Sequence, residues 1–347
     1  MTVDEMMKQV QGELGDDPAA NLKKIADFAD TLRKEPNSAE LLEALAAFAY
    51  EQMPAEDRAA MEETTFAAGK RMDQTFADAL KLINADKAEE AAKLLGAISE
   101  KIEKYFENGE TKWFSFRNPF EYHMYRYFFP DDKEFERAPF DFAHYLVTYA
   151  YTLIEIGETR AARNALLRAI TFNPVGADIR FEYAELCKFA KNMPDLLESC
   201  RVTAKIAASA DRMARVCANL GYYCEEIGEL YAAAVFYFES MRFLPSKPVE
   251  TALQDTVKHM KVEGIKFVPP TADQVKETFA KFNVPEMPNS DLVNLALVMA
   301  KQAQEYKRLD LEGLFYRVAF DMTNDPQFKA ELERVDKAIA AQQNAES

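Results

Sequence analysis

Apolar residues recur at helical spacing along most of the chain, and prolines and short polar turns interrupt them. In residues 1–110, Pro18, Pro36 and Pro54 separate apolar runs that are long enough to form helices. The run after Pro54 predicts a helical region from about residue 55 to residue 84. Because the intervening turns are short, the pattern predicts antiparallel helix pairs.

Two windows of the middle region, 143–174 and 214–245, share one arrangement of small and large residues. Numbered from the start of each window, the matching positions are 7 (Tyr149, Leu220), 8 (Ala150, Gly221), 11 (Leu153, Cys224), 15 (Gly157, Gly228), 20 (Ala162, Ala233), 24 (Leu166, Tyr237) and 32 (Pro174, Pro245). Small residues at positions 8 and 20 let two helices approach closely, and the larger apolar residues fill the seam between them. The proline ends the second helix because it cannot continue a helix interior.

This pattern resembles the tetratricopeptide repeat (TPR), whose unit of about 34 residues is a helix–turn–helix. One further repeat fits between the two windows, beginning near Ala177. It has Leu196 at position 20, so its two helices are expected to lie further apart. The resemblance implies an all-α fold, a right-handed α-α superhelix. The chain as a whole also resembles bacterial TPR-containing proteins of unassigned function, and this resemblance does not point to any particular activity.

Changes in composition and in turn residues divide the chain into four parts. These are an acidic N-terminal block of helical hairpins with degenerate repeats (1–110), an aromatic helix insert and linker (111–142), three TPR-like repeats (143–250), and a proline-containing linker with a C-terminal helix pair (251–347). Within the last part, Thr271 and Gln274 have the spacing of a capping box, which predicts a short helix as far as about Phe282.

The stretch KWFSFRNPFEYHMYRYFFP, residues 112–130, concentrates aromatic side chains. Asn118 suits a helix N-cap and Pro119 the first helical position, so a helix is predicted to begin there and to stop at Pro130. Two interpretations stay open. The rings form a buried plug that joins the acidic block to the repeats, or several rings line a ligand site together with His123 and Arg126.

The charge balance restricts the classes of partner. The 347 residues include 42 Lys and Arg against 58 Asp and Glu, a net charge of −16. This acidity argues against nucleic acid and against anionic membrane surfaces as partners. Neither a secretory leader nor an apolar run of membrane-spanning length is evident, so we expect a cytoplasmic protein.

The residues that carry most enzyme chemistry show no recognisable motif. The sequence has no phosphate-binding glycine loop, zinc motif, EF-hand or nucleophile elbow, and its three histidines (His123, His144 and His259) lie far apart. We therefore expect no metal, no cofactor and no catalysis. The four cysteines fall at seam positions, where we expect them to act as small buried apolar residues (Cys187, Cys200, Cys217 and Cys224).

In the TPR family, the first helix of each repeat lines a concave groove, and the resemblance implies the same here. The predicted groove residues are aromatic or acidic: Tyr151, Glu155, Phe181, Glu185, Phe189, Tyr222, Glu225 and Glu226. Val147 and Tyr151 stand where chaperone-binding members have their carboxylate clamp, so a chaperone C-terminus is disfavoured. The alternatives are that this face is only solvated, or that it is filled by the protein's own aromatic helix.

The function expected from the sequence is therefore a non-catalytic protein–protein interaction module or scaffold. Its groove would bind an apolar or basic peptide or helix of a protein partner. The main alternative is a cytoplasmic regulator that responds to a peptide or a small ligand, and an enzyme comes third.

Overall fold

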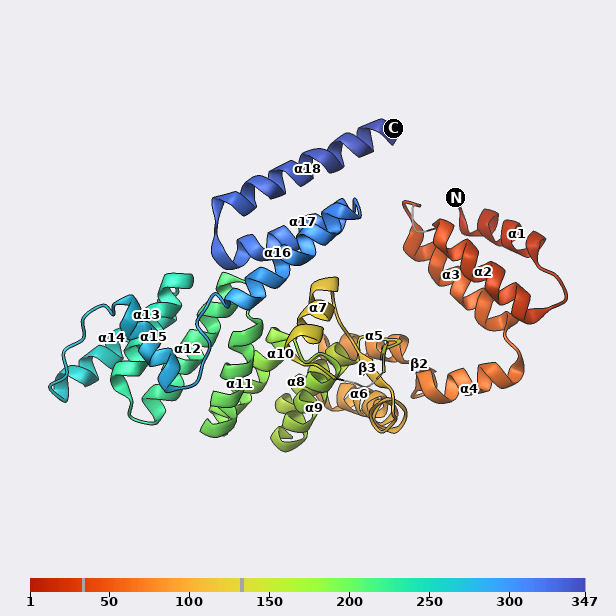
Figure 1. Ribbon diagram of the computed structural model, residues 1–347. Helices are drawn as coiled ribbons and strands as arrows, with labels where there is room; N and C mark the ends of the chain where they lie inside the picture. Colours follow the sequence, from red (N-terminus) through yellow and green to blue (C-terminus); the bar gives the residue numbers. More distant parts are fainter. Residues whose placement is uncertain (33–34, 132–133, 347) are drawn as a thin grey trace.

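The computed structural model describes residues 1–32, 35–131 and 134–346, and it is an all-α protein built from helices that pack in pairs (Figure 1). The N-terminal elements are α1 (Val3–Glu13), α2 (Pro18–Leu32), α3 (Ser38–Gln52), α4 (Ala55–Thr65), β1 (Phe66–Ala67) and β2 (Lys70–Arg71). Helices α1 to α3 have a hydrophobic core of their own, formed by Met6, Val10, Ile25, Leu32, Leu41, Leu45 and Phe48. In Figure 1 they form a bundle at one end of the molecule, and α4, which buries none of its residues, leads from it to the repeats.

The predicted continuous helical region from 55 to 84 is wrong, because a β-hairpin interrupts it. Strands β1 and β2 pair antiparallel, with Phe66 opposite Arg71. The two residues of the turn, Ala68 and Gly69, both have positive φ (52° and 80°). Such a turn matches the twist of a tight hairpin. Glycine adopts this conformation readily, but alanine gives no signal for it in the sequence.

Four helix pairs follow one another along the array, each with a first helix (A) and a second helix (B). They are α5 (Met72–Ile83) with α6 (Ala88–Ile102), α8 (Phe142–Glu155) with α9 (Thr159–Phe172), α10 (Ala177–Phe189) with α11 (Met193–Ile206), and α12 (Ala210–Glu226) with α13 (Leu230–Phe243). The next helix, α14 (Lys247–Val262), packs on α13 and extends the array. These pairs are the helix–turn–helix units that the repeat pattern predicted.

The same turn joins A to B in every pair. One residue of the turn has a positive φ, between 53° and 83°: Asp86, Gly157, Lys191 and Gly228. The next backbone N–H donates to a carbonyl in the last turn of helix A, as Glu158 does to Leu153 at 2.8 Å. This bond satisfies a carbonyl that would otherwise lack an intrahelical partner. Only two of these four positions are glycine, so the same turn forms at Asp86 and Lys191 without the residue that adopts a positive φ most readily.

The seams between paired helices are packed as the small-residue pattern requires. A methyl group added at Gly221 would lie 2.5 Å from ring atoms of Tyr237, so only glycine fits this close approach. Ala162 and Ala233 are fully buried at the equivalent position of helix B. In the middle repeat the larger Leu196 is buried there instead, and α10 and α11 form a smaller interface than the neighbouring pairs.

The aromatic insert leaves the array after α6. Its elements are a π-helical turn η1 (Glu103–Glu107), β3 (Lys112–Phe114), α7 (Pro119–Phe128) and β4 (Phe135–Arg137), with β3 and β4 paired in parallel. Helix α7 begins as predicted, because the side chain of Asn118 accepts a hydrogen bond from the N–H of Glu121 at 3.0 Å. The helix ends at Phe128, two residues before Pro130, where the sequence predicted that it would stop.

The C-terminal helices fold back onto the rest of the molecule. They are α15 (Ala272–Lys281), α16 (Ser290–Glu305), α17 (Leu309–Thr323) and α18 (Pro326–Glu346). Thr271 and Gln274 form the predicted capping box at the start of α15. Helix α16 contacts α7, and α17 contacts α12, while α18 adds a third helix to the expected C-terminal pair (Figure 1).

Candidate functional site

The predicted groove residues lie on α8, α10 and α12, the A helices of three consecutive repeats. We call the outward-facing side chains of these three helices the A-helix surface. Tyr151 is 45% exposed and Phe189 is 78% exposed, whereas Phe181 is only 3% exposed. Tyr222 is half-buried. Three of the four predicted acidic residues are exposed (Glu155, Glu185 and Glu226), and Glu225 is partly buried.

A chain of polar contacts crosses the A-helix surface from α8 to α12. Burial, together with the nearby carboxylate of Glu182 on α10, raises the pKa of Tyr151 on α8. The guanidinium of Arg215, on α12, lies 3.3 Å from Glu182 and 3.7 Å from Glu185. It also covers the ring of Phe181 at 4.6 Å from the ring centre. Phe181 therefore forms a base on which Arg215 is held, and its ring is not open to a partner.

The second half of the surface is held by lysines of α10 and its turn. Lys188 pairs with Glu185 at 2.9 Å, and Lys191 pairs with Glu226 at 2.7 Å. Lys191 also donates to the hydroxyl of Tyr222 at 2.8 Å, and both ammonium groups lie within 6 Å of the centre of the Tyr222 ring. The A-helix surface thus carries a network of ion pairs, in which arginine and lysine side chains of the protein largely neutralise the acidic groups.

Glu225 has a structural role that its sequence position did not reveal. Its carboxylate accepts a hydrogen bond from Tyr237 of α13 at 2.7 Å and another from the hydroxyl of Thr256 on α14. These contacts tie helix A of one repeat to its own helix B and to the next helix of the array. The side chain is consequently engaged between helices.

Two apolar side chains add to the surface that the sequence predicted. Ile154, near the end of α8, is 44% exposed, and Ile227, just after α12, is 43% exposed. Together with Tyr151 and Phe189 they give the A-helix surface a series of exposed apolar groups. A single exposed apolar residue is ordinary, but a group of them on adjacent helices is a feature of interaction surfaces.

The aromatic insert packs mainly as a plug. Phe120, Met124 and Tyr125 of α7 are each 3% exposed or less, and the ring of Phe120 lies 6.0 Å from that of Phe315 on α17. The plug therefore joins the C-terminal helices to the array. His123 also faces Phe315, at 5.9 Å, and burial lowers its pKa.

Other rings of the insert border an open cavity of about 760 Å³ against α9. Trp113, Phe114 and Phe129 line it, together with Arg168. All three guanidinium nitrogens of Arg168 are already engaged, by Glu107 and by Ser99. Arg126, the other residue considered for a ligand site, lies over the ring of Phe135 at 5.6 Å.

The cysteines are buried in the seams, as predicted. All four are free thiols, and none is more than 3% exposed. Burial raises the pKa of Cys187 to about 11 and that of Cys200 to about 12. Burial also raises the pKa of the Cys217 and Cys224 thiols.

Two absences hold for the residues that the structure describes. Within them, no group of three or more His, Cys, Asp or Glu side chains is placed to hold a metal ion. No helix in the same part of the chain combines the length and the apolar content needed to cross a membrane.

The fold and this surface define a helical-repeat protein of the TPR-like class. No family model matches the sequence, and no curated protein matches it. The chain is similar to a solved structure from the functional characterization of Pseudomonas aeruginosa PilF, with 13% identity, 77% of this chain and 97% of that chain covered, and a TM-score of 0.38. It is also similar to the APC/C hetero-tetramer Cut9–Hcn1, with 10% identity, coverage of 92% and 52%, and a TM-score of 0.37. With scores this low, the assignment of the fold rests on the helix pairs and their recurrent turns.

Proposed function

We propose that the protein is a non-catalytic interaction module that binds a peptide or helix of a partner protein across the A-helix surface. The observation that carries this proposal is the set of exposed apolar side chains on successive A helices, above all Tyr151, Ile154 and Phe189. Stacked repeats present such side chains along an extended surface, which suits a linear segment.

The ion pairs of this surface support a role in binding rather than in catalysis. Glu182 and Glu185 are held by Arg215, and Glu226 is held by Lys191, so these groups fix the A helices relative to one another. A partner would meet a rigid surface on which the aromatic rings supply most of the contact area. We therefore propose an apolar segment as the main determinant of affinity, with basic residues of the partner in a secondary role beside Glu155.

The proposal is tested by placing a photo-crosslinking amino acid at position 189. Native lysate is irradiated, and the crosslinked peptide is identified by mass spectrometry. The same crosslinker at Tyr306, which is 79% exposed at the end of α16, serves as the matched control. We expect one peptide to crosslink at position 189 and not at position 306.

The identified segment is then synthesised, and its affinity is measured for the wild type and for Tyr151→Ala, Phe189→Ala and Tyr222→Ala. Aromatic anchors of an interface contribute about 2 kcal/mol each, so each variant should weaken binding by about 30-fold. Tyr306→Ala should leave the affinity unchanged. Unchanged binding by all three A-helix variants, or equal crosslinking at both positions, would contradict the proposal.

A further inference from the structure

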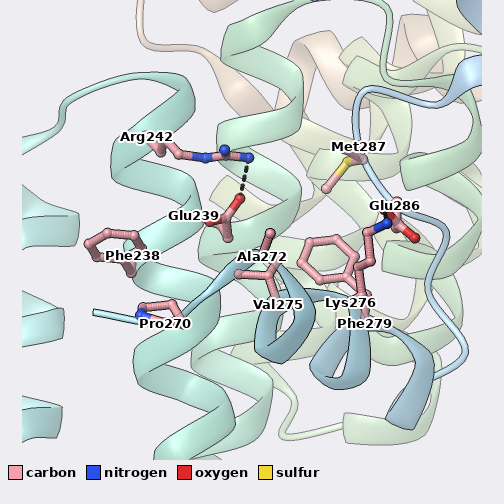
Figure 2. A pocket seen from close by; sticks show the side chains of 10 residues that line it. All are labelled: Phe238, Glu239, Arg242, Pro270, Ala272, Val275, Lys276, Phe279, Glu286 and Met287. Atoms are coloured by element: carbon pink, nitrogen blue, oxygen red, sulfur yellow. Dashed lines mark ion pairs between the residues drawn. The ribbon is translucent and has the colours of Figure 1, made fainter. Parts of the chain in front are cut away.

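A cavity of about 210 Å³ lies between α13 and the linker helix α15, away from the A-helix surface (Figure 2). Helix α13 contributes Phe238, Glu239 and Arg242 to its wall, and Val275 and Phe279 come from α15. The remaining lining residues are Pro270, Ala272, Lys276, Glu286 and Met287. The α13 wall thus carries the charges of Glu239 and Arg242, and the facing wall is mostly apolar, with Lys276 and Glu286 as its charged residues.

The charged wall is built around a buried carboxylate. Glu239 is only 3% exposed, and its Oε2 lies 2.6 Å from a guanidinium nitrogen of Arg242. Among the residues that the structure describes, no other cation lies within ion-pair distance of this carboxylate. Burial raises the pKa of Glu239, which is the expected response of a carboxyl group removed from water. Removing a charge from water costs free energy, and a carboxylate that is buried in a cavity wall is therefore a candidate for ligand binding.

Arg242 presents a complementary charge to the same space. Its side chain is 60% exposed, and Figure 2 shows the guanidinium extended beside Glu239. A negative and a positive group therefore stand side by side at one end of the cavity. At the other end the ring of Phe279 and the side chains of Val275 and Met287 provide apolar contacts.

The size of the cavity limits the ligand to a small molecule. An engineered apolar cavity of roughly 150 Å³ is known to hold benzene, so 210 Å³ accommodates a body of similar size with a polar head. The geometry points to a free α-amino acid with an apolar side chain, whose ammonium group pairs with Glu239 and whose carboxylate pairs with Arg242. Its side chain fills the space against Val275, Phe279 and Met287.

The position of the cavity gives such a ligand a structural consequence. Helix α15 is held on the array by ring contacts of Phe279 and Phe282 with Phe236, at 5.0 and 5.8 Å between ring centres. A ligand in the cavity adds contacts across the same junction. It would fasten the linker that leads from the repeats to α16, and so couple ligand binding to the C-terminal helices.

The test measures binding of L-leucine, L-methionine and L-phenylalanine to the full-length protein by isothermal titration calorimetry. Two analogues of leucine isolate the charges: 4-methylpentanoate lacks the ammonium group, and isoamylamine lacks the carboxylate. We expect at least one amino acid to bind at least 10-fold more tightly than the matching single-charge analogues, about 1.4 kcal/mol or more. No binding of any of the three at about 10 mM would overturn the proposal, as would equal binding of a single-charge analogue.

Variants place the ligand in this cavity. Glu239→Gln keeps the size of the side chain. Glu239→Gln and Arg242→Gln should each weaken binding by about 10-fold or more. Val275→Phe fills the apolar end of the cavity and replaces no charged residue, and it should abolish binding. Glu250→Gln is the matched control, because Glu250 pairs with Lys247 over the same helical spacing at an exposed position. Binding that is unchanged in Glu239→Gln and Val275→Phe, with folding verified by circular dichroism, would place the ligand elsewhere and refute this site.

Discussion

Helix α7 and the A-helix surface are both rich in aromatic residues, yet Phe120 of the first and Phe189 of the second have opposite environments. In α7, Phe120 is 2% exposed and packs on Phe315 of α17. On the A-helix surface, Phe189 is 78% exposed at the end of α10. The composition of the two regions does not distinguish them. The difference comes from the C-terminal helices, which fold back over α7 and not over the end of α10.

This comparison separates two uses of aromatic side chains in one molecule. The buried rings of α7, Phe120 and Tyr125, are internal contacts between distant parts of the chain, so their loss should be seen as lost stability. The exposed rings of the A-helix surface, Tyr151 and Phe189, are only partly covered by other residues, so their loss should be seen as lost binding. Substitutions in the two regions should therefore have different effects when they are compared in the same assay.

The largest contrast is expected in thiol chemistry. At pH 8, a cysteine introduced by Phe189→Cys should react rapidly with a thiol reagent in the native protein. Cys187, Cys200, Cys217 and Cys224 are buried, and their raised pKa values leave less of the reactive thiolate, so they should react at least about 100-fold more slowly. Unfolding in guanidinium should make all of them reactive. Fast native labelling of a wild-type cysteine would show that the seams open.

Truncation of a buried ring should be the most damaging substitution. Phe120→Ala is expected to lower the free energy of unfolding by about 3–5 kcal/mol, because it leaves a cavity between α7 and α17. Phe189→Ala should change it by no more than about 0.5 kcal/mol. Urea denaturation followed by circular dichroism measures both. Similar losses in the two variants would remove the distinction between plug and surface.

Removal of a buried carboxylate should also lower stability more than removal of an exposed one. Glu121 is 3% exposed and accepts hydrogen bonds from Arg117 and from Asn173 at 2.7–2.9 Å. Glu121→Ala leaves these donors without an acceptor and should cost about 3 kcal/mol. Glu226→Ala removes an exposed ion pair and should leave the melting temperature almost unchanged. Equal melting temperatures for both variants would contradict the burial of Glu121.

The smallest measurable contrast concerns the start of α7. Asn118→Ala removes the side chain that accepts the N–H of Glu121 and should cost about 1 kcal/mol. Asn164→Ala, at an exposed position within α9, removes no cap and should be neutral or slightly stabilising, since alanine has the higher helix propensity. A neutral Asn118→Ala would indicate that packing alone determines where α7 begins.

Several features were predictable because their signals are local. The N-cap of α7, the capping box at Thr271 and the close approach at Gly221 each depend on residues a few positions apart or on one repeat unit. The repeat pattern likewise predicted the seams in which the cysteines are buried. The turn at Ala68 was missed, since alanine seldom has a positive φ, and so was helix α14, which carries no repeat signature.

The helix on which each predicted groove residue lies followed from the sequence, but the surroundings of its side chain did not. The repeat pattern placed Tyr151, Phe181 and Tyr222 on successive A helices, and in the structure these residues lie on α8, α10 and α12. Whether a given side chain on them is free depends on cations from neighbouring helices. Arg215 covers Phe181, and Lys191 pairs with Glu226. Acidic residues that the sequence predicted to face a partner therefore form ion pairs within the protein.

By itself, the sequence determined most of the helices, the caps at Asn118 and Thr271, and the seams within each repeat, because these depend on the side chains of adjacent turns and paired helices. Only the tertiary structure decided which aromatic groups are covered and which charges are paired. Those outcomes depend on contacts between residues far apart in the chain, such as Phe120 with Phe315 and Arg117 with Asp178. Helical periodicity carries no information about such distances, because the same apolar face can be covered by any segment that folds back onto it.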